Sequence, residues 1–468
     1  MTEKIIQQKS EIPVMRQGLA RKFTCWAGNC YCTCCQNWEV VVDDNTREMY
    51  KKDVPEAFER LKIMQNNNGQ PIHVIDHVSH NGVRQCPFFD KEGLCGIVKK
   101  YGEDCLCTLC YYFPNVHKKI GNKIYMPLAI PCPASAELAL YSNDLSDFSW
   151  YPSTRPRVED VSDAKKNFPG ADTDKLINMF DAVMYLVNGE SATPGEIIGK
   201  LLLFANDYDN IPYNKKLDYY LRSITIASKG TVNFVSSWQT LDYEDSLLHV
   251  ISRLLARREG WTYINSLLSI VKNVFPNKGG ILDSFDSRKT KELDDVIETY
   301  NKKMKIATPQ QKNELNKKID EAIRERNNII KKTNDDLSGT ICGNKNSRSF
   351  SELKKIWNVR KHEFDDIFKN YIRSALCRIV YPLGVTHLDT KCDIYLIAVH
   401  FAMLRFILIC IIDKIKDVET DKDMIVKIFQ GFERAVYTNE AKTEIQNYNG
   451  VINVYNTHFL LDLCCNYV

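Results

Sequence analysis

The sequence predicts an α-rich α+β protein with two unequal parts. A small cysteine-rich metal-binding head with a short hairpin is followed by a mainly helical body with a projecting helical hairpin. Eleven of the 17 cysteines lie between Cys25 and Cys132, among short strand-like runs and turns, whereas apolar residues at helical spacing dominate after Thr173. The composition, 44% hydrophobic and 26% charged, excludes a largely disordered chain.

The charge balance and the apolar segments argue against nucleic acid and membranes as partners. Since 62 Lys and Arg stand against 59 Asp and Glu, the net charge of +3 is too small for nonspecific nucleic-acid binding. The first residues lack the apolar region and cleavage site of a secretory signal, so we expect a cytoplasmic protein. Residues 394–412 are apolar enough to span a membrane but contain His400 and Arg405. Because Arg near a bilayer centre costs about 2.5–3.5 kcal/mol, we predict a buried core helix, with Arg405 facing a cleft or an acidic partner, and no membrane partner.

In the head, residues 38–42 predict a strand, and Asp43 can begin the helix that follows. A second helix is predicted from an Asp53 N-cap through Gln65, with Pro55 in its first turn. The β-prone runs 72–79 and 83–89 are joined by Asn-Gly, a pairing typical of a tight hairpin.

In the body, apolar residues at helical spacing predict helices within 174–187, 195–205, 217–227, 245–256 and 263–275. Two narrow apolar stripes predict an antiparallel helical hairpin at 288–335, either a solvated pair of helices or a docking arm. We therefore predict a head over 1–150, helical domains over 151–287 and 351–468, and the charged hairpin between them, followed by a turn-rich linker at 336–350.

The head cysteines form three clusters, CWAGNCYCTCC, CPFFDKEGLC and CLCTLC, and one further cysteine in IPCP. Cys32/Cys35 and Cys107/Cys110 have the Cys-x-x-Cys spacing, which points two thiolates at one ion. Disulfides are rare in a reducing cytosol, and eleven is an odd number. The clusters therefore predict a site for zinc or an iron–sulfur cluster. We interpret His73, His77 and His80 as a solvated hairpin face, with metal ligation as the alternative, and the six cysteines after Cys132 as core residues.

The order of these motifs, FTCWAGNCYCTCCQNW, CPFFDKEGLCGI, GEDCLCTLCYYFP and IPCPASAELAL, resembles the flagellin lysine-N-methylase family. The NYIRSALCRIVYP segment, with Asn370 and Tyr371, resembles the family's C-terminal region more loosely. The resemblance implies a methyltransferase that uses S-adenosylmethionine to modify ε-amines of flagellin, its protein substrate. It also implies a [4Fe–4S] cluster, with zinc as the alternative metal. The implied metal-binding residues are Cys25, Cys30, Cys34, Cys35, Cys86, Cys95, Cys107, Cys110 and Cys132.

The sequence departs from the family pattern at several positions. Cys32 and Cys105 are additional cysteines, and Tyr111 and Asn115 stand where the family often has arginine. A strand–GxGxG–helix fingerprint of a Rossmann cofactor site is absent from the sequence, and so is the Cys-x-x-x-Cys-x-x-Cys ligand set of radical enzymes. The sequence identifies no catalytic or cofactor-binding residue.

Two other functions remain open. The first is a non-catalytic zinc- or iron-chelating module on a helical adaptor. The second, a thiol–disulfide or electron-transfer protein, is based on the Cys-x-x-Cys turns but lacks a thioredoxin-like βαβ frame.

Overall fold

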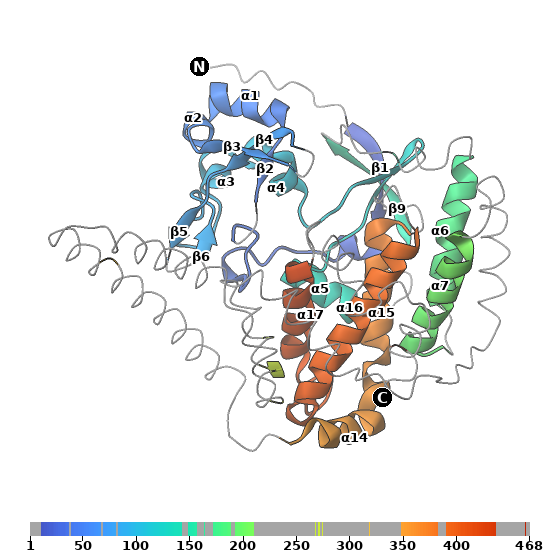
Figure 1. Ribbon diagram of the computed structural model, residues 1–468. Helices are drawn as coiled ribbons and strands as arrows, with labels where there is room; N and C mark the ends of the chain where they lie inside the picture. The colour runs from blue at the N-terminus through green and yellow to red at the C-terminus, as the bar shows by residue number, and fades with distance from the viewer. Residues whose placement is uncertain are drawn as a thin grey trace, which may run out of the picture. The chain divides into compact units, whose positions relative to one another are not determined.

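The computed structural model in Figure 1 describes most of the head and the main helices of the body. The described residues are 11–36, 39–66, 69–80, 83–142, 148–156, 163, 172–188, 192–209, 267, 270, 271, 274, 318, 348–381, 390–436 and 464. Contacts divide the chain into two units. The first comprises residues 1–235, 364–398 and 460–465, and the second comprises 236–363, 399–459 and 466–468. Small sheets together with long helices confirm the α+β class.

The largest sheet of the first unit has the strand order β7-β8-β1-β9. Its strands are β1 (Glu11–Gln17), β7 (Lys118–Ile120), β8 (Lys123–Met126) and β9 (Trp150–Pro156). β1 runs parallel to β8 and antiparallel to β9. The rings of Tyr125 and Trp150 lie 4.8 Å apart, and Phe180 from a body helix lies 6.0 Å from Trp150. This aromatic group connects the sheet to the helices of the same unit.

A smaller sheet and a hairpin carry the loops with most of the cysteines. The sheet order is β2-β4-β3, from β2 (Val41–Val42), β4 (Pro71–Ile75) and β3 (Leu61–Gln65). α1 (Asp44–Asp53) follows β2, and its N-cap Asp43 accepts a hydrogen bond from the Thr46 amide at 2.9 Å. The hairpin pairs β5 (Val78–His80) with β6 (Val83–Gln85).

The structure corrects the second predicted helix of the head. α2 covers only Pro55–Phe58, its N-cap is Val54 rather than Asp53, and Leu61–Gln65 forms β3. The reason is tertiary pairing, because Leu61 lies opposite Ile75 and Ile63 opposite His73 along β4. Such ladders override local helix propensity.

The predicted hairpin is confirmed in its inner part. His80 lies opposite Val83, although the two turn residues between them are outside the described residues. Residues 71–75 belong instead to the other sheet. The three histidines are therefore distributed over β4, the following loop and β5, and their interpretation as one hairpin face is wrong for His73 and His77.

The helices of the first unit pack around α15 (Asp365–Ile379), which contacts α5 (Pro133–Leu140), α6 (Thr173–Val187) and α7 (Pro194–Asp209). α6 and α7 confirm two of the predicted body helices. Two short helices of the head, α3 (Gly96–Tyr101) and α4 (Thr108–Tyr112), each follow a cysteine. Short 3₁₀ turns occur at Gly18–Arg21, Ala27–Asn29 and Glu103–Cys105.

The C-terminal helices are α14 (Phe350–Arg360), α16 (Thr390–Ile411) and α17 (Lys422–Val436), with 3₁₀ turns at Lys361–Phe364 and Ile412–Lys414. Ser349 and Glu352 form a capping box that begins α14. The apolar helix Asp393–Lys414 has the length and hydropathy of a membrane span, but its apolar window is fully buried in the structure. Arg405 is buried with it, and its guanidinium lies 5.1 Å from the centre of the Phe401 ring. The prediction of a buried core helix is confirmed.

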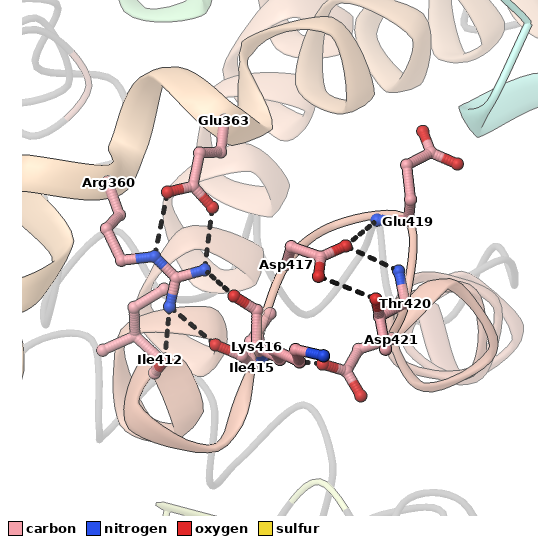
Figure 2. A network of polar contacts seen from close by, with 9 residues as sticks. All are labelled: Arg360, Glu363, Ile412, Ile415, Lys416, Asp417, Glu419, Thr420 and Asp421. Atoms are coloured by element: carbon pink, nitrogen blue, oxygen red, sulfur yellow. Dashed lines mark hydrogen bonds and ion pairs between the residues drawn. The ribbon is translucent and has the colours of Figure 1, made fainter.

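Figure 2 shows how Arg360 at the end of α14 fixes the turn after α16. Its guanidinium donates two hydrogen bonds to the carboxylate of Glu363 at 2.9 and 2.7 Å. It also donates to the carbonyl oxygens of Ile412, Ile415 and Lys416. A cation at a helix C-terminus satisfies carbonyls that have no partner inside the helix.

Several predicted elements lie outside the described residues. They are the helices at 217–227 and 245–256, nearly all of the charged hairpin at 288–335, and most of the linker at 336–350. Within 263–275, Leu267, Ile270, Val271 and Val274 are helical. The division into four domains stays a prediction.

Candidate functional site

Three of the eleven cysteines of the head stand at the beginnings of helices. Cys95, Cys107 and Cys132 are the N-caps of α3, α4 and α5. First-turn amides lie near each sulfur, although none of the three thiols forms a cap hydrogen bond. Those of Ile97 and Val98 counteract the effect of burial on the pKa of Cys95, and other first-turn amides do the same at Cys107 and Cys132. Such N–H groups stabilise negative charge on sulfur, whether on a free thiolate or on a metal ligand.

Backbone contacts bring the cysteine segments together. The Cys86 amide donates to the Cys35 carbonyl at 2.7 Å, which joins the first cluster to the second. The Thr108 amide at the start of α4 donates to the Asp43 carboxylate at 3.1 Å, so the residue that caps α1 also holds the third cluster. Burial opposes ionisation of Asp43, but hydrogen bonds from Thr46 and Thr108 keep its pKa below the ordinary value.

The thiol groups of these segments influence one another electrostatically. Cys34 is close enough to Cys35, Cys86 and Cys110 to affect the pKa of each thiol. It affects the pKa values of Cys30, Cys95 and Cys132 in the same way. The nine cysteines implied by the family resemblance form one connected set, namely Cys25, Cys30, Cys34, Cys35, Cys86, Cys95, Cys107, Cys110 and Cys132.

Most of these thiols resist ionisation because they are buried. Burial raises the pKa of Cys86 and of Cys132 to about 12 and that of Cys30 to about 11. The pKa of Cys107 is lowered, first by a hydrogen bond from the Cys110 side chain, which leaves the proton on Cys110. Because a metal binds thiolates, binding here would release protons and be strengthened as the pH rises.

The type of donor atom, not ligand geometry, supports a metal at these cysteines. Among the described residues, no group of three or more His, Cys, Asp or Glu side chains is arranged to hold a metal ion. None of the nine cysteines forms a disulfide, and the pKa values of Cys95, Cys107 and Cys132 respond to nearby backbone N–H groups. Such a donor set suits zinc or an iron–sulfur cluster and does not suit Mg²⁺ or Ca²⁺. The assignment of a metal stays a prediction.

The remaining cysteines and histidines of the head have other contacts. The Cys105 thiol donates to the Tyr101 carbonyl at 3.5 Å, and Cys32 is buried. His77 Nδ1 lies 3.0 Å from the Ile75 carbonyl oxygen, and His73 Nδ1 lies 3.5 Å from the Arg47 guanidinium. Of the later cysteines, Cys377, Cys410 and Cys464 are buried, as expected for core residues.

A buried polar pair on α15 was not singled out as a site in the sequence. The Asn370 side-chain amide donates to the carbonyls of Leu140 and Ser142, both at 2.9 Å, at the end of α5. Arg373 Nη1 donates to Asn370 Oδ1 at 2.6 Å. The available signal was an asparagine and an arginine, three residues apart, in a helix whose neighbouring residues are apolar.

Comparisons with known proteins find similarity to lysine-N-methylases. A family profile described as the FliB lysine N-methylase C-terminal domain matches residues 277–449. The lysine-N-methylases of Salmonella typhimurium LT2 and Salmonella choleraesuis SC-B67 are 24% and 23% identical to the chain over 199 residues. Over these residues the chain is similar to the lysine-N-methylases.

The cysteine motifs of the head resemble the lysine-N-methylases, and the family profile matches the C-terminal part of the chain. The matches span 42% of the chain and about half, 47%, of the two Salmonella methylases. The flagellar biosynthetic protein FliU of Salmonella muenchen is 27% identical over 128 residues, which are 26% of this chain and 74% of FliU. No solved structure matches.

Proposed function

We propose that the protein is a lysine N-methyltransferase that transfers a methyl group from S-adenosylmethionine to lysine ε-amines of flagellin in the cytoplasm. The observation that carries this proposal is the family match, because the relatives are named lysine-N-methylases. The name of the relative FliU connects it to flagellar biosynthesis, which supports flagellin as the substrate. S-adenosylmethionine as the donor comes from the family resemblance.

The cysteine cluster is the proposed site of a [4Fe–4S] cluster, with zinc as the alternative. Ligands would come from the thiols that surround Cys34, namely Cys35, Cys86, Cys95, Cys107 and Cys110. Cys25, Cys30 and Cys132 extend the set. With three cysteine ligands such a cluster would offer an iron open to the cofactor, and with four it would serve as a structural or charge centre.

The reaction places one clear demand on the protein chain. The lone pair of a neutral amine attacks the methyl carbon, the carbon–sulfur electrons return to sulfur, and the product ammonium loses a proton. A free lysine with a pKa of about 10.4 is only about 0.1% neutral near pH 7.4. The site must therefore desolvate the amine or accept its proton.

Co-expression with flagellin tests the proposal. Intact-mass spectrometry of the flagellin should show increments of about 14 Da for each methyl group. The increments should be lost with a Cys34→Ala/Cys35→Ala variant and kept with Cys105→Ser, in which a hydroxyl can still donate to the Tyr101 carbonyl. Unmodified flagellin beside folded, metal-loaded protein would overturn the proposal.

The second candidate function is a non-catalytic metal-chelating module on a helical adaptor. It is favoured by the number of cysteines in the head, because four thiolates would complete a structural zinc site without any enzymatic role. A colourless protein with stoichiometric zinc and no methyl transfer would support the module. A brown protein, purified without air, with iron and sulfide would support the cluster.

A further inference from the structure

Arg373 is a buried cation whose hydrogen-bonding groups are only partly used. The residue is 6% exposed and projects from α15, one turn after Asn370. Its Nη1 donates to Asn370 Oδ1, and its guanidinium lies 5.7 Å from the centre of the Phe148 ring. Its Nε is buried and has no hydrogen-bond partner.

No carboxylate neutralises this guanidinium within the part of the chain that the structure describes. Asp366 acts on it through space, but that residue makes no ion pair with it. A buried arginine ordinarily has a counterion, because an unpaired charge in a protein interior is costly. A guanidinium has five N–H donors, and one of them donates to Asn370 Oδ1.

A purely structural role leaves most of this group unexplained. The end of α5 is held by the Asn370 amide, which reaches Leu140 and Ser142 without help from Arg373. Arg373 orients that amide through one nitrogen, a task that a neutral donor would perform at a lower desolvation cost. The charge and the planar fork of the guanidinium match a carboxylate, which accepts two parallel hydrogen bonds.

We propose that Arg373, oriented by Asn370 and Phe148, binds the carboxylate of the methyl donor. This assignment rests on the proposed methyltransferase function. A carboxylate can also come from an acidic side chain of the protein substrate. The small donor is favoured because Arg373 is only 6% exposed, which leaves little surface for a side chain of a folded protein to contact.

Calorimetry on the full-length, metal-loaded protein tests the assignment with two nucleosides. S-adenosylhomocysteine carries the amino-carboxylate arm, and methylthioadenosine lacks it. We expect wild-type protein to bind S-adenosylhomocysteine more tightly. In Arg373→Gln the affinity for S-adenosylhomocysteine should fall about 10- to 100-fold, the range for a charge-assisted pair, while that for methylthioadenosine is unchanged.

The matched controls separate binding from folding. Ser374→Ala removes a neighbouring buried hydroxyl from the same helix and should leave both affinities unchanged. If Arg373→Gln does not fold, Arg373→Lys keeps the charge but loses the fork, and its affinity for S-adenosylhomocysteine should still fall selectively. Equal affinity of the folded variant and wild type for S-adenosylhomocysteine overturns the proposal. So does an equal loss for both nucleosides.

Two further measurements distinguish this proposal from the function on which it rests. If Arg373→Gln weakens binding of flagellin but not of S-adenosylhomocysteine, the carboxylate comes from the substrate and the donor assignment is wrong. If wild-type protein binds neither nucleoside and methylates nothing, the proposed function fails. In that case, the shift in unfolding temperature caused by acetate tests whether Arg373 binds a carboxylate, independently of the proposed function. Protection of wild type but not of Arg373→Gln supports a carboxylate site, and equal protection refutes it.

Discussion

Gly28 packs directly against Gly93, and this contact joins the first cysteine loop to the second. A Cβ atom on Gly28 would lie 2.6 Å from the carbonyl oxygen of Glu92. A Cβ atom on Gly93, whose φ is +76°, would lie 3.2 Å from Gly28 Cα. The two loops therefore approach backbone to backbone, a distance that only glycine allows.

We expect Gly28→Ala to reduce the metal content of the purified protein. The new methyl group must displace the Glu92 backbone, which separates the loop that carries Cys30 and Cys34 from the one that carries Cys95. Overpacking of this kind costs about 1–3 kcal/mol. The measurement is metal per protein after anaerobic purification. Gly69→Ala is the control, since a Cβ atom on Gly69 would have no neighbour within 4 Å, although the φ of this residue is also positive. Equal metal content in both variants would contradict the role of the contact.

The CLCTLC segment offers a matched pair of cysteines. Cys107 is fully buried and shares a hydrogen bond with Cys110, whereas Cys105 donates to a backbone carbonyl. We expect Cys107→Ser to lose most of the metal and Cys105→Ser to keep it, because serine is a poor ligand for soft metals. Metal analysis of the two proteins checks this. Loss of metal from Cys105→Ser alone would show that the wrong thiol of the segment has been assigned.

His117 should make the protein less stable in mild acid. Burial, with Arg155 and Lys118 nearby, lowers the pKa of His117 from 6.5 to about 4. Between these pH values the unfolded chain binds a proton that the folded chain does not. The free energy of unfolding therefore falls as the pH falls, by up to roughly 3 kcal/mol from this group.

His117→Phe should flatten this acid limb, since phenylalanine does not titrate and can keep the edge contact with Tyr112, now at 4.3 Å between ring centres. Urea unfolding at several pH values between 6.5 and 4.5 measures the effect. Parallel stability curves for the variant and wild type would rule out His117 as the source.

The hydrogen bonds of the Arg360 guanidinium should stabilise the folded state of the second unit (Figure 2). Arg360→Ala removes the hydrogen bonds to Glu363 and to the carbonyls after α16, so we expect a loss of about 1–3 kcal/mol in the free energy of unfolding. Arg360→Lys should recover only part of it, because an ammonium lacks the fork. Lys427→Ala breaks an exposed pair with Asp423 and should change stability by less than about 0.5 kcal/mol. Similar losses in both alanine variants would count against the fork.

The sequence predicted the elements whose signals are local. The cap at Asp43, the paired hairpin strands near His80 and the helices α6 and α7 follow from capping, turn chemistry and periodicity. The segment after Phe58 was wrongly predicted as helix, because its state is decided by pairing with β4, a partner that local propensity cannot indicate.

For the site, sequence spacing identified the cysteines but not what brings them together. The Gly28–Gly93 contact and the bond from Thr108 to Asp43 join residues that are 65 apart in the sequence. Asn370 reaches Leu140 across 230 residues. Long-range packing of this kind has no local pattern, so the buried Arg373 had no visible partner in the sequence.

A transfer assay with a labelled donor tests the central claim most directly. Anaerobically purified protein is mixed with flagellin and S-adenosylmethionine that carries a trideuterated methyl group, and flagellin peptides are analysed by mass spectrometry. We predict increments of about 17 Da on lysine side chains, which depend on the metal-loaded cysteine cluster. Flagellin lysines that stay unmodified by a folded, metal-loaded protein would contradict it.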